Sequence, residues 1–507
     1  MEKELGTVLT PPKTAEYIVF KLGDIKKKKK VLDPCVGPGI FIKALLNKGV
    51  DKSQIFCHDI NPKYKKIVED LGVDFKNVDN LLSFNSDCYE EYDFIVGNPP
   101  YLNKASSYVR KNREELKKIY GAINAHETYS MFIVNSIWRL REGGKLGFIT
   151  SDSFLTLRTH FKLRKFILDN CIINEILLAP INLFDKQSVS TYPVIFILTK
   201  NSKDDKEQDR DKNIMKIIPR IKSEEEYWKP PIITKIKQKR YKSLPFNIFF
   251  VDVEDQILNL FEEASKLELF IKGYIGMHTH NNKKFIAAID GTELADIFRK
   301  KRTNQIKEER FKVISHADLE SGRWKSYLKR GGGEQYYRPI MEALDWEENS
   351  ISIYDIPKNV PFGREGIVIS GVSSRLAARY MPEGCYWDSN KAMGFIVKDN
   401  SISIEYFLGL LNSSLYNYLA KGIINNTNSI QLTGIHSLPF IKPDKGTHED
   451  ISLLVKKIIE SKKKDLSYDY KEEQKLINDL IFELYSKRFN LSQNLRKQLE
   501  ENYTSYK

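Results

Sequence analysis

The sequence predicts an α/β fold: a doubly wound Rossmann-like sheet first, then a mixed α+β domain, then C-terminal helices. Over residues 1–200, short apolar runs of strand length alternate with amphipathic segments of helical spacing. This alternation is typical of a parallel sheet with helices on its faces. From about residue 245 the pattern changes to short strands and loops interrupted by glycine, and from about 448 to lysine- and glutamate-rich helical spacing. Residues 201–212 lack apolar side chains and read as an exposed loop or linker. We therefore expect domains at 1–212, 213–447 and 448–507.

A glycine-rich turn follows the first predicted strand and leads into a helix, with the sequence Asp33-Pro34-Cys35-Val36-Gly37-Pro38-Gly39. Gly37 and Gly39 allow the backbone to approach a ligand where a Cβ would clash. The pattern differs from the dinucleotide fingerprint G-x-G-x-x-G. Asp33 gives the turn a negative group, which repels pyrophosphate but suits a cationic ligand such as a sulfonium amino acid.

The next predicted strand, residues 55–60, ends in Asp59-Ile60. A carboxylate at a strand end can accept hydrogen bonds from both hydroxyls of a ribose. Asp79 and Asn80 then form a polar pair in an apolar setting, placed to read the edge of an adenine. These elements occur in order and with strand-sized spacing, so they predict a binding site for a nucleoside-containing ligand.

The tetrapeptide Asn98-Pro99-Pro100-Tyr101 directly follows the apolar run 92–96, which reads as a buried strand. Ligands bind at the carboxyl ends of such strands in open α/β sheets. The prolines remove backbone donors and fix φ near −65°, so carbonyl oxygens, an amide and a phenol remain to face a substrate. Such a set of acceptors suits an amino group that donates two hydrogen bonds. The alternative is an ordinary proline-rich turn.

These motifs, in this order, resemble the S-adenosylmethionine-dependent methyltransferases that modify an exocyclic amino nitrogen. The opening segment 6–12 resembles the extra N-terminal motif of the gamma-class DNA N6-adenine methyltransferases. The resemblance implies S-adenosylmethionine as cofactor, held by Thr10 and by the residues of the glycine turn, Asp59-Ile60 and Asp79-Asn80. An ordinary helix with Thr10 as N-cap and Pro11 as its first residue is compatible with that role.

The resemblance also implies a catalytic set of Asn98, Pro99, Pro100, Tyr101 and Phe184. In the family a phenylalanine shortly before a V-S step faces the flipped base, and Phe184 stands before Val189-Ser190; the alternative is a core phenylalanine. The Asn98 side-chain oxygen and the Pro99 carbonyl would each accept one N6 proton. Stacking on two aromatic rings, worth ~1–3 kcal/mol per base, would roughly offset the few kcal/mol needed to flip a nucleotide.

Composition favours a polyanionic partner, since the 507-residue chain carries a net charge of +13. The five cysteines are scattered without a C-x-x-C pair, which fits a reducing cytoplasm and neither disulfides nor a zinc site. No apolar run is long enough to cross a bilayer. We expect no metal: His278 and His280 form an H-x-H without nearby ligands in sequence and read as surface or phosphate-contacting residues.

The second half supplies the candidates for DNA contact. Residues 324–338 combine lysine, arginine, glycine and aromatic residues, and residues 366–375 form a second glycine-containing segment ending in arginine. Basic side chains neutralise phosphates, and glycines let a backbone approach DNA closely. The candidates are Lys329, Arg330, Arg338 and Arg375; the alternative is that these segments are loops of an ordinary β-rich domain.

The arrangement most resembles the modification enzymes of restriction–modification systems, within them the PstI/BsuBI-type methyltransferases, for which the target would be CTGCAG. This resemblance implies double-stranded DNA as the substrate and a separate cognate restriction endonuclease as a functional partner. One alternative is another planar amino nitrogen, in RNA or a protein glutamine. Others are a fused restriction–modification polypeptide, disfavoured because the cofactor motifs begin at residue 6, and a subunit of a larger DNA-defence complex, catalytic or only DNA-binding.

Overall fold

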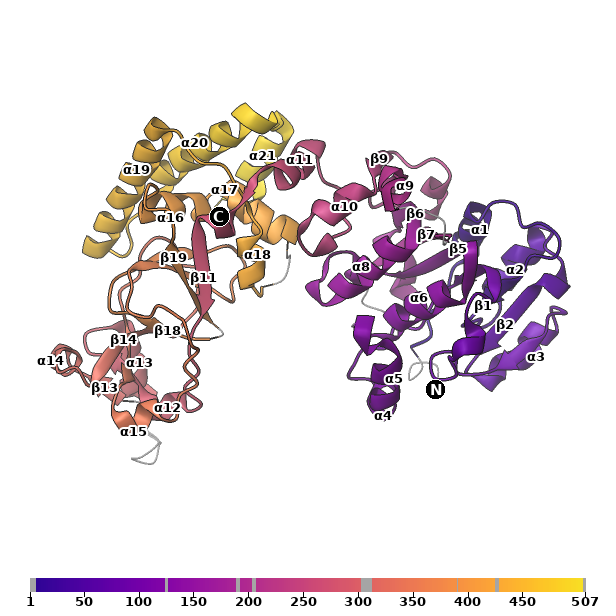
Figure 1. Cartoon of the computed structure of the whole chain (residues 1–507), viewed down its shortest axis with the longest axis horizontal. Helices are drawn as coiled ribbons and strands as arrows, with labels where there is room; N and C mark the ends of the chain where they lie inside the picture. The colour runs from indigo at the N-terminus through magenta and orange to yellow at the C-terminus, as the bar shows by residue number, and fades with distance from the viewer. Residues whose placement is uncertain are drawn as a thin grey trace. The chain divides into compact units, whose positions relative to one another are not determined.

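The computed structural model describes residues 6–123, 126–187, 192–202, 207–301, 312–389, 391–424 and 428–504. The chain divides into two compact units, residues 1–253 and 254–507 (Figure 1). Each unit has its own sheets, helices and buried core and is described by itself.

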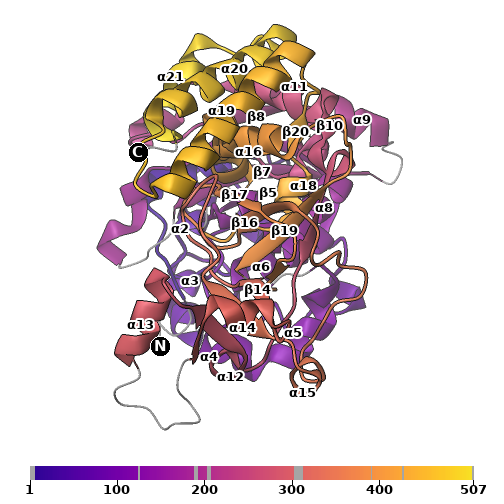
Figure 2. The same cartoon turned by 90° about the vertical axis from the view of Figure 1, so that its left-hand side faces the viewer.

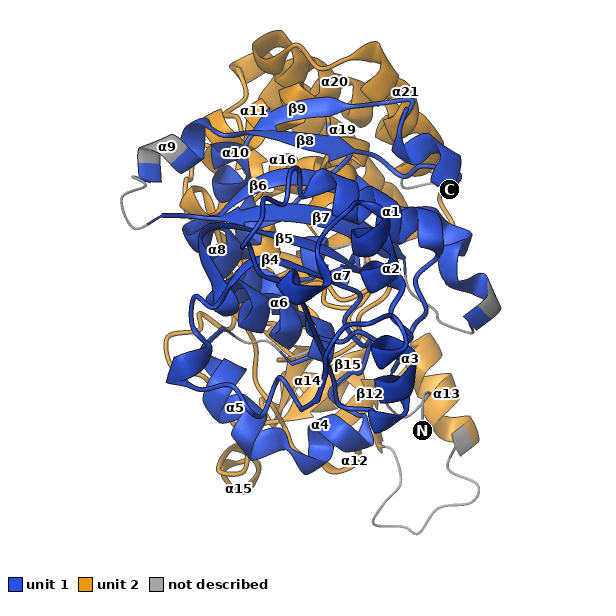
Figure 3. Ribbon diagram, turned by 90° about the vertical axis from the view of Figure 1, so that its right-hand side faces the viewer, with its two compact units in different colours: residues 1–253 blue, residues 254–507 orange. Residues whose placement is uncertain are grey.

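The first unit is built on one nine-stranded mixed sheet in the order β3-β2-β1-β4-β5-β7-β6-β8-β9 (Figure 3). Strands β3, β2, β1, β4 and β5 run parallel to one another. Strand β7 is antiparallel to both β5 and β6. The strands are β1 (Val31–Asp33), β2 (Ile55–Asp59), β3 (Phe75–Asn77), β4 (Tyr92–Gly97), β5 (Leu140–Ser151), β6 (Cys171–Leu178), β7 (Pro193–Lys200), β8 (Ile214–Ile218) and β9 (Thr234–Lys237).

Helices lie on both sides of this sheet (Figure 3). Helix α1 packs on α2 and on β5 and β7, while α6 and α8 pack on each other and on β5 and β6. The helices are α1 (Pro12–Lys21), α2 (Ile40–Asn47), α3 (Lys65–Glu69), α4 (Ser107–Lys111), α5 (Arg113–Tyr120), α6 (Thr128–Arg139), α7 (Ser153–Thr156), α8 (Phe161–Asn170), α9 (Glu207–Lys212) and α10 (Lys239–Ser243). The doubly wound, Rossmann-like architecture predicted from the sequence is confirmed.

The carboxyl ends of β1, β2 and β4 meet at one edge of the sheet because these strands are parallel neighbours. Val31 of β1 pairs with Ile55 of β2 on one side and with Phe94 of β4 on the other. The strands are apolar because both faces of the sheet are covered, and Val31, Ile55 and Val96 lie in the core. The turns that follow the three strands are thereby brought together.

The first unit extends beyond residue 212, where we expected the catalytic domain to end. Strands β8 and β9 add to its sheet, β8 in parallel to β6 and β9 antiparallel to β8. The predicted exposed linker, residues 201–212, contains helix α9, and Lys242 of α10 forms ion pairs with Glu207 and Asp211; its residues 203–206 lie outside the described part. The polar composition that predicted a linker therefore belongs in part to the surface helix α9.

The second unit combines two main sheets with a group of helices. A four-stranded sheet has the order β11-β19-β16-β17, a five-stranded sheet has the order β13-β12-β15-β14-β18, and β10 pairs with β20. The strands are β10 (Ser265–Lys266), β11 (Ile271–Ile275), β12 (Ile286–Ile289), β13 (Lys312–Ile314), β14 (Trp324–Leu328), β15 (Glu342–Asp345), β16 (Gly366–Ser370), β17 (Ala378–Met381), β18 (Tyr386–Trp387), β19 (Ala392–Val397) and β20 (Pro439–Phe440). This is the mixed α+β domain that the sequence predicted.

The last three helices of the second unit are α19, α20 and α21 (Figure 2), of which α19 and α20 are long. Helix α19 packs on α16 and α20. Ile458 of α19 and Ile481 of α20 are buried, whereas Leu453 and Leu476 on the same helices are 69% and 52% exposed. The helices are α11 (Asp255–Glu263), α12 (Asn282–Phe285), α13 (Glu293–Lys301), α14 (His316–Glu320), α15 (Glu348–Ile351), α16 (Ile404–Asn412), α17 (Ser414–Asn417), α18 (Leu432–His436), α19 (Lys445–Lys464), α20 (Lys471–Phe489) and α21 (Gln493–Asn502).

No helix among the described residues combines the length and the apolar composition needed to span a bilayer.

Candidate functional site

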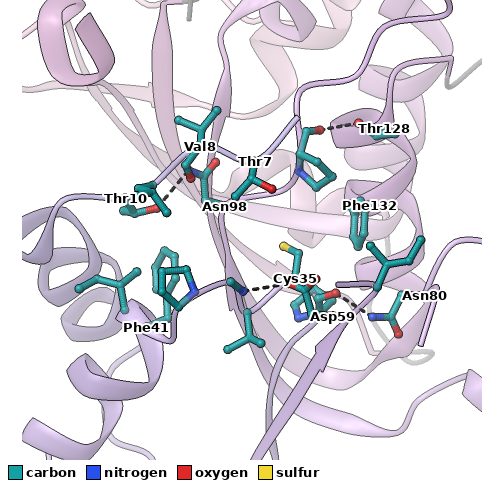
Figure 4. Close-up of a pocket in the computed structure, with 18 of the residues that line it drawn as sticks. Thr7, Val8, Thr10, Cys35, Phe41, Asp59, Asn80, Asn98, Thr128 and Phe132 are labelled. Atoms are coloured by element: carbon teal, nitrogen blue, oxygen red, sulfur yellow. Dashed lines mark hydrogen bonds between the residues drawn. The ribbon is translucent and has the colours of Figure 1, made fainter. Parts of the chain in front are cut away.

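A cavity of about 290 Å³ lies where the turns after β1, β2 and β4 meet (Figure 4). Its volume is at the lower end of the range for small-molecule sites. Of the predicted site residues it is lined by Thr10, Pro34, Cys35, Gly37, Asp59, Ile60, Asp79, Asn80, Asn98 and Pro100. Asp33, Gly39, Pro99, Tyr101 and Phe184 are not among its lining residues. The structure therefore gathers most of the predicted cofactor residues, together with Asn98, around one space.

The glycine turn depends on two left-handed residues, Gly37 with φ of 51° and Gly39 with φ of 80°. A Cβ at Gly37 would meet no neighbouring atom within 4 Å, so the bare backbone leaves room on the cavity side. The Gly37 N–H donates to Asp59 Oδ2 at 2.9 Å, and the Asn61 N–H donates to Asp59 Oδ1 at 2.8 Å. Asp59 thus holds the turn while its carboxylate lines the cavity. Burial raises the pKa of Asp59.

Asp33 lies fully buried directly behind the turn. Its Oδ1 accepts from the Cys35 N–H at 3.1 Å, and its Oδ2 has no hydrogen-bond partner among the described residues. Burial raises the pKa of Asp33 well above its usual value and the Asp59 carboxylate raises it further, while the Cys35 N–H compensates a charge there only in part. A cation bound next to the turn would supply that compensation, so this orphaned oxygen fits the expected positively charged ligand.

The two residues of the polar pair are used differently. The Asn80 side chain accepts from His58 Nδ1 at 2.9 Å and donates to the Pro34 carbonyl at 2.7 Å, so it ties the glycine turn to the neighbouring strand. Burial lowers the pKa of His58 to about 4, so the ring is neutral. Its Nδ1 is the donor because Asn80 Oδ1 can only accept. Asp79 instead faces Tyr108, whose hydroxyl donates to Asp79 Oδ2 at 2.8 Å.

The Asn98 amide is oriented by the N-terminal segment. Its Nδ2 donates to the Val8 carbonyl at 2.9 Å and to Thr10 Oγ1 at 3.0 Å, as Figure 4 shows. Because a carbonyl can only accept, the NH₂ group must face Val8. The opposite atom, Asn98 Oδ1, is buried and has no hydrogen-bond partner among the described residues. The site thus holds a preoriented oxygen whose lone pairs accept no hydrogen bond from the described residues.

The alternative role of Thr10 as helix N-cap is wrong. Helix α1 begins at Pro12, its N-cap is Pro11, and no side chain caps it. Thr10 lies one residue earlier, with its hydroxyl bonded to Asn98. The two consecutive prolines shift the start of the helix by one residue, since the residue before a proline is held in an extended conformation.

Thr128 anchors the loop that contains the two prolines. Its Oγ1 donates to the Pro100 carbonyl and accepts from the Leu102 N–H at 2.9 Å, and its own N–H donates to the Leu102 carbonyl at 2.9 Å. Thr128 is the first residue of α6 and is 1% exposed. A buried side chain at the start of α6 therefore fixes the backbone that follows Asn98.

Tyr101 and Phe184 lie next to each other without an open slot between them. Their ring centroids are 6.4 Å apart with the planes tilted by 59°, which is an aromatic contact. Phe184 is 1% exposed and belongs to the core cluster on which Tyr101 packs, so the core alternative for Phe184 agrees with this geometry. A base could stack between these two rings only after they had separated. The Val189-Ser190 step lies outside the described residues.

Sequence reasoning missed four residues around the cavity. Phe132 of α6 and Tyr108 of α4 line it, Thr128 holds the proline loop, and the Val8 carbonyl orients Asn98. Phe132 and Thr128 occupy buried positions of an amphipathic helix, where their spacing looks like that of any core residue. Nothing in the sequence distinguishes them.

Each of the four DNA-contact candidates has a partner inside the second unit. Lys329 pairs with Asp388, and Arg330 pairs with Glu342 at 3.0 Å. Arg338 donates to the Gly331 carbonyl and Arg375 to the Gly333 carbonyl. The two candidate segments, 324–338 and 366–375, therefore meet in space, and their role in DNA contact stays a prediction.

The H-x-H pair does have a nearby ligand group, contrary to our expectation. His280 Nε2 lies 2.9 Å from Asp355 Oδ2, and His278, His280 and Asp355 offer ligand atoms within 4.8 Å of one another. Asp355 is 75 positions further along the chain, so only the fold brings it to the histidines.

Two family models match the chain. One is the Eco57I restriction-modification methylase model, over residues 40–184, and the other is the TaqI-like C-terminal specificity domain, over residues 318–440. The first match includes most of the cavity, the proline loop and Phe184. The second lies within the second unit.

Curated relatives and a solved structure agree with these matches. The type II methyltransferase M.HincII of Haemophilus influenzae is 25% identical over 90% of this chain and 94% of its own length. M.BstVI of Geobacillus stearothermophilus is 29% identical over 39% of this chain, which spans 42% of that relative. The type IIL restriction-modification enzyme MmeI, solved in complex with DNA, shares the fold with a TM-score of 0.51 at 12% identity, over 95% of this chain and 72% of that one.

Proposed function

We propose that this chain, a type II restriction–modification methyltransferase of the Eco57I/TaqI-like family, transfers a methyl group to the N6 nitrogen of a flipped-out adenine in double-stranded DNA. The donor is S-adenosylmethionine. The observation that carries the proposal is the Asn98 side chain, whose Nδ2 is held by Val8 and Thr10 while its Oδ1 is buried without a partner among the described residues.

The cavity residues fit S-adenosylmethionine. The Asp59 carboxylate keeps lone pairs for two ribose hydroxyls, and Phe132 offers an apolar wall. Asp79 and the backbone at Asn80 also line the cavity and would bind the adenine edge. A cationic methionine end bound beside the glycine turn would favour the ionised form of the buried Asp33 carboxylate, whose Oδ2 has no partner among the described residues. When bound, this cofactor supplies an electrophilic methyl group on a sulfonium. The chain's own contribution is positioning, which can lower a barrier by ~7–11 kcal/mol when the reacting atoms are aligned.

Asn98 and Pro99 act on the nucleophile. The lone pair of an exocyclic amine is delocalised into the ring, so the nitrogen must become pyramidal before it attacks a methyl group. Asn98 Oδ1 and the Pro99 carbonyl each accept a hydrogen bond from one amine N–H, and these bonds tighten as the nitrogen becomes tetrahedral; one amine proton leaves to solvent once the new N–C bond has replaced the S–C bond. Acceptors that bind more tightly in the transition state than in the ground state raise kcat.

Removing the Thr10 hydroxyl loosens this acceptor. In Thr10→Val, the Asn98 amide keeps only its bond to the Val8 carbonyl, so its Oδ1 is less firmly aimed. We expect kcat to fall about 2- to 12-fold, the equivalent of one ordinary hydrogen bond of about 0.5–1.5 kcal/mol, whereas Thr10→Ser restores it. Steady-state methylation of a duplex measures both. A change confined to the KM for S-adenosylmethionine would mean that Thr10 contacts only the cofactor.

Removing the Thr128 hydroxyl releases the proline loop. Thr128→Val leaves the buried Leu102 N–H and Pro100 carbonyl without this partner, at about 1–3 kcal/mol for each group. We expect kcat to fall by about 10- to 100-fold, with affinity for S-adenosylmethionine within about 3-fold of wild type and full recovery in Thr128→Ser. Single-turnover kinetics measure the loss in the methyl-transfer rate, and cofactor titration measures the affinity for S-adenosylmethionine. Equal losses in binding and in kcat would indicate general unfolding of the site instead.

The second unit carries the TaqI-like specificity domain, and we assign to it the recognition of the target sequence. The chain's charge of +13 suits a DNA substrate. In the cytoplasm of a prokaryotic host the modification would protect DNA from a separate cognate restriction endonuclease. Sequencing that host's DNA for N6-methyladenine, with and without this chain, tests substrate and site together. Methyl groups found only in RNA or in protein glutamine would contradict the proposal.

The target sequence is a separate proposal. Resemblance to the PstI/BsuBI-type enzymes gives CTGCAG, while the relatives named above belong to other restriction–modification systems. Plasmid methylated by this chain should then resist cutting at CTGCAG. Cutting at CTGCAG in DNA that nevertheless carries N6-methyladenine elsewhere would reject this target and leave the reaction in place.

A further inference from the structure

We propose that His278, His280 and Asp355 form a binding site for one divalent transition-metal ion in the second unit. This site is separate from the methyl-transfer cavity and does not depend on the proposed reaction. Among the described residues, these three are the one group of at least three histidine, cysteine, aspartate or glutamate side chains with ligand atoms all within 4.8 Å of one another.

The backbone holds two of the three ligands opposite each other. His278 and Asp355 form an antiparallel bridge, in which the His278 N–H donates to the Asp355 carbonyl at 3.1 Å and the Asp355 N–H donates back at 2.9 Å. Residues in such a bridge have their Cβ atoms about 4.5–5.5 Å apart. The separation of these two side chains is therefore set by main-chain hydrogen bonds rather than by a flexible surface loop.

The third ligand, His280, directly follows an anchored residue. Thr279, between the histidines, is 1% exposed, and its hydroxyl donates to Asn282 Oδ1 at 2.7 Å. His280 has φ of 59°, a left-handed conformation that is uncommon for residues other than glycine, although histidine is among the enriched types. In this arrangement the two imidazole rings lie 4.6 Å apart, edge to face, and His280 Nε2 reaches Asp355.

The donor set indicates which ligand binds. Two imidazole nitrogens and one carboxylate oxygen suit zinc, cobalt or nickel, whereas magnesium and calcium prefer oxygen ligands. The Asp355 carboxylate makes a phosphate an unsuitable occupant, because it would repel the anion. Tetrahedral coordination at 2.0–2.1 Å requires donors about 3.4 Å apart. The side chains of His280 and Asp355 are 50% and 74% exposed, so they can rotate by the remaining distance.

A metal ion at this site would cross-link two distant segments of the second unit. His278 and His280 follow β11, and Asp355 follows α15. Three protein ligands leave a fourth position for water, as in open zinc sites. The ion would replace the weak exposed His280–Asp355 ion pair with bonds that hold both segments.

Calorimetric titration of zinc chloride into untagged, chelator-treated full-length protein tests the site. We expect one ion bound per chain, with no comparable heat from magnesium chloride. His280→Ala and Asp355→Asn should each weaken zinc binding at least about tenfold, by analogy with the 10–100-fold losses seen when metal-site residues are replaced. The matched control, His316→Ala, alters an exposed histidine on α14 and should bind as wild type.

Cobalt absorption identifies the ligands. Bound cobalt should give visible d–d bands without the near-ultraviolet thiolate band that a cysteine site would produce. Circular dichroism of each variant keeps loss of folding distinct from loss of the site. Absence of stoichiometric zinc binding, retention of full affinity in both ligand variants, or a thiolate band would overturn the proposal.

Discussion

Asn98→Ala abolishes methyl transfer while leaving binding of DNA and S-adenosylmethionine within a few-fold of wild type. The reason is that Asn98 Oδ1, buried and without a partner among the described residues, acts on the target nitrogen mainly as that nitrogen becomes tetrahedral. Removing one preorganised hydrogen-bonding group of this kind costs about 10²–10³ in kcat elsewhere. Single-turnover transfer of labelled methyl groups to a duplex measures the loss.

The matched control is Asn103→Ala. Asn103 is an exposed asparagine five positions further along the chain, and its Oδ1 accepts from the Ala105 N–H in a local turn. We expect wild-type turnover in that variant. Near wild-type turnover in Asn98→Ala itself would remove Asn98 from the mechanism.

Asp59→Ala eliminates cofactor binding at ordinary concentrations. Its carboxylate lines the cavity and also holds the Gly37 and Asn61 N–H groups. Loss of two ribose hydrogen bonds to a charged group, at about 1.5–3 kcal/mol each, corresponds to a rise in Kd of about 10²–10⁴. The unsupported glycine turn adds to this. Calorimetric titration with S-adenosylmethionine gives the Kd, and thermal melting shows whether the fold survives.

The same carboxylate predicts a direction for the pH dependence. Burial raises the pKa of Asp59 above its usual value, and the ionised form is the better acceptor for ribose hydroxyls. Cofactor affinity should therefore be constant at pH values well above this raised pKa and fall as pH decreases through it. The Asp59→Ala variant, with its weak residual binding, should lack that fall. An unchanged Kd in Asp59→Ala would place the ribose elsewhere.

The sequence predicted the fold of the first unit well because its signals are local. Apolar runs of strand length, glycine turns and helical spacing do not depend on distant residues, and β1, β2 and β4 lie where they were expected. The end of the unit was harder to predict. Strands β8 and β9 join the sheet only through pairing with distant partners, and the polar helix α9 before them looked like a linker.

The residues of the candidate site also fall into two classes: those that belong to local sequence motifs and those that only the fold brings to the site. Asp59 and Asn98 belong to contiguous motifs at strand ends, and the structure places both at the cavity. Thr128 and Phe132 reach it from the buried face of α6, where their sequence spacing matches that of core residues. The partners of Lys329 and Arg330 could not be foreseen either, because Asp388 and Glu342 meet them only through strand pairing in the second unit.

Mass spectrometry of nucleosides from a defined duplex, after incubation with this protein and S-adenosylmethionine, tests the central assignment most directly. The predicted product is N6-methyladenine, formed by the wild-type chain and absent with Asn98→Ala. Methylation of a ring carbon or of a cytosine, or N6-methyladenine formed equally well without the Asn98 amide, would contradict it.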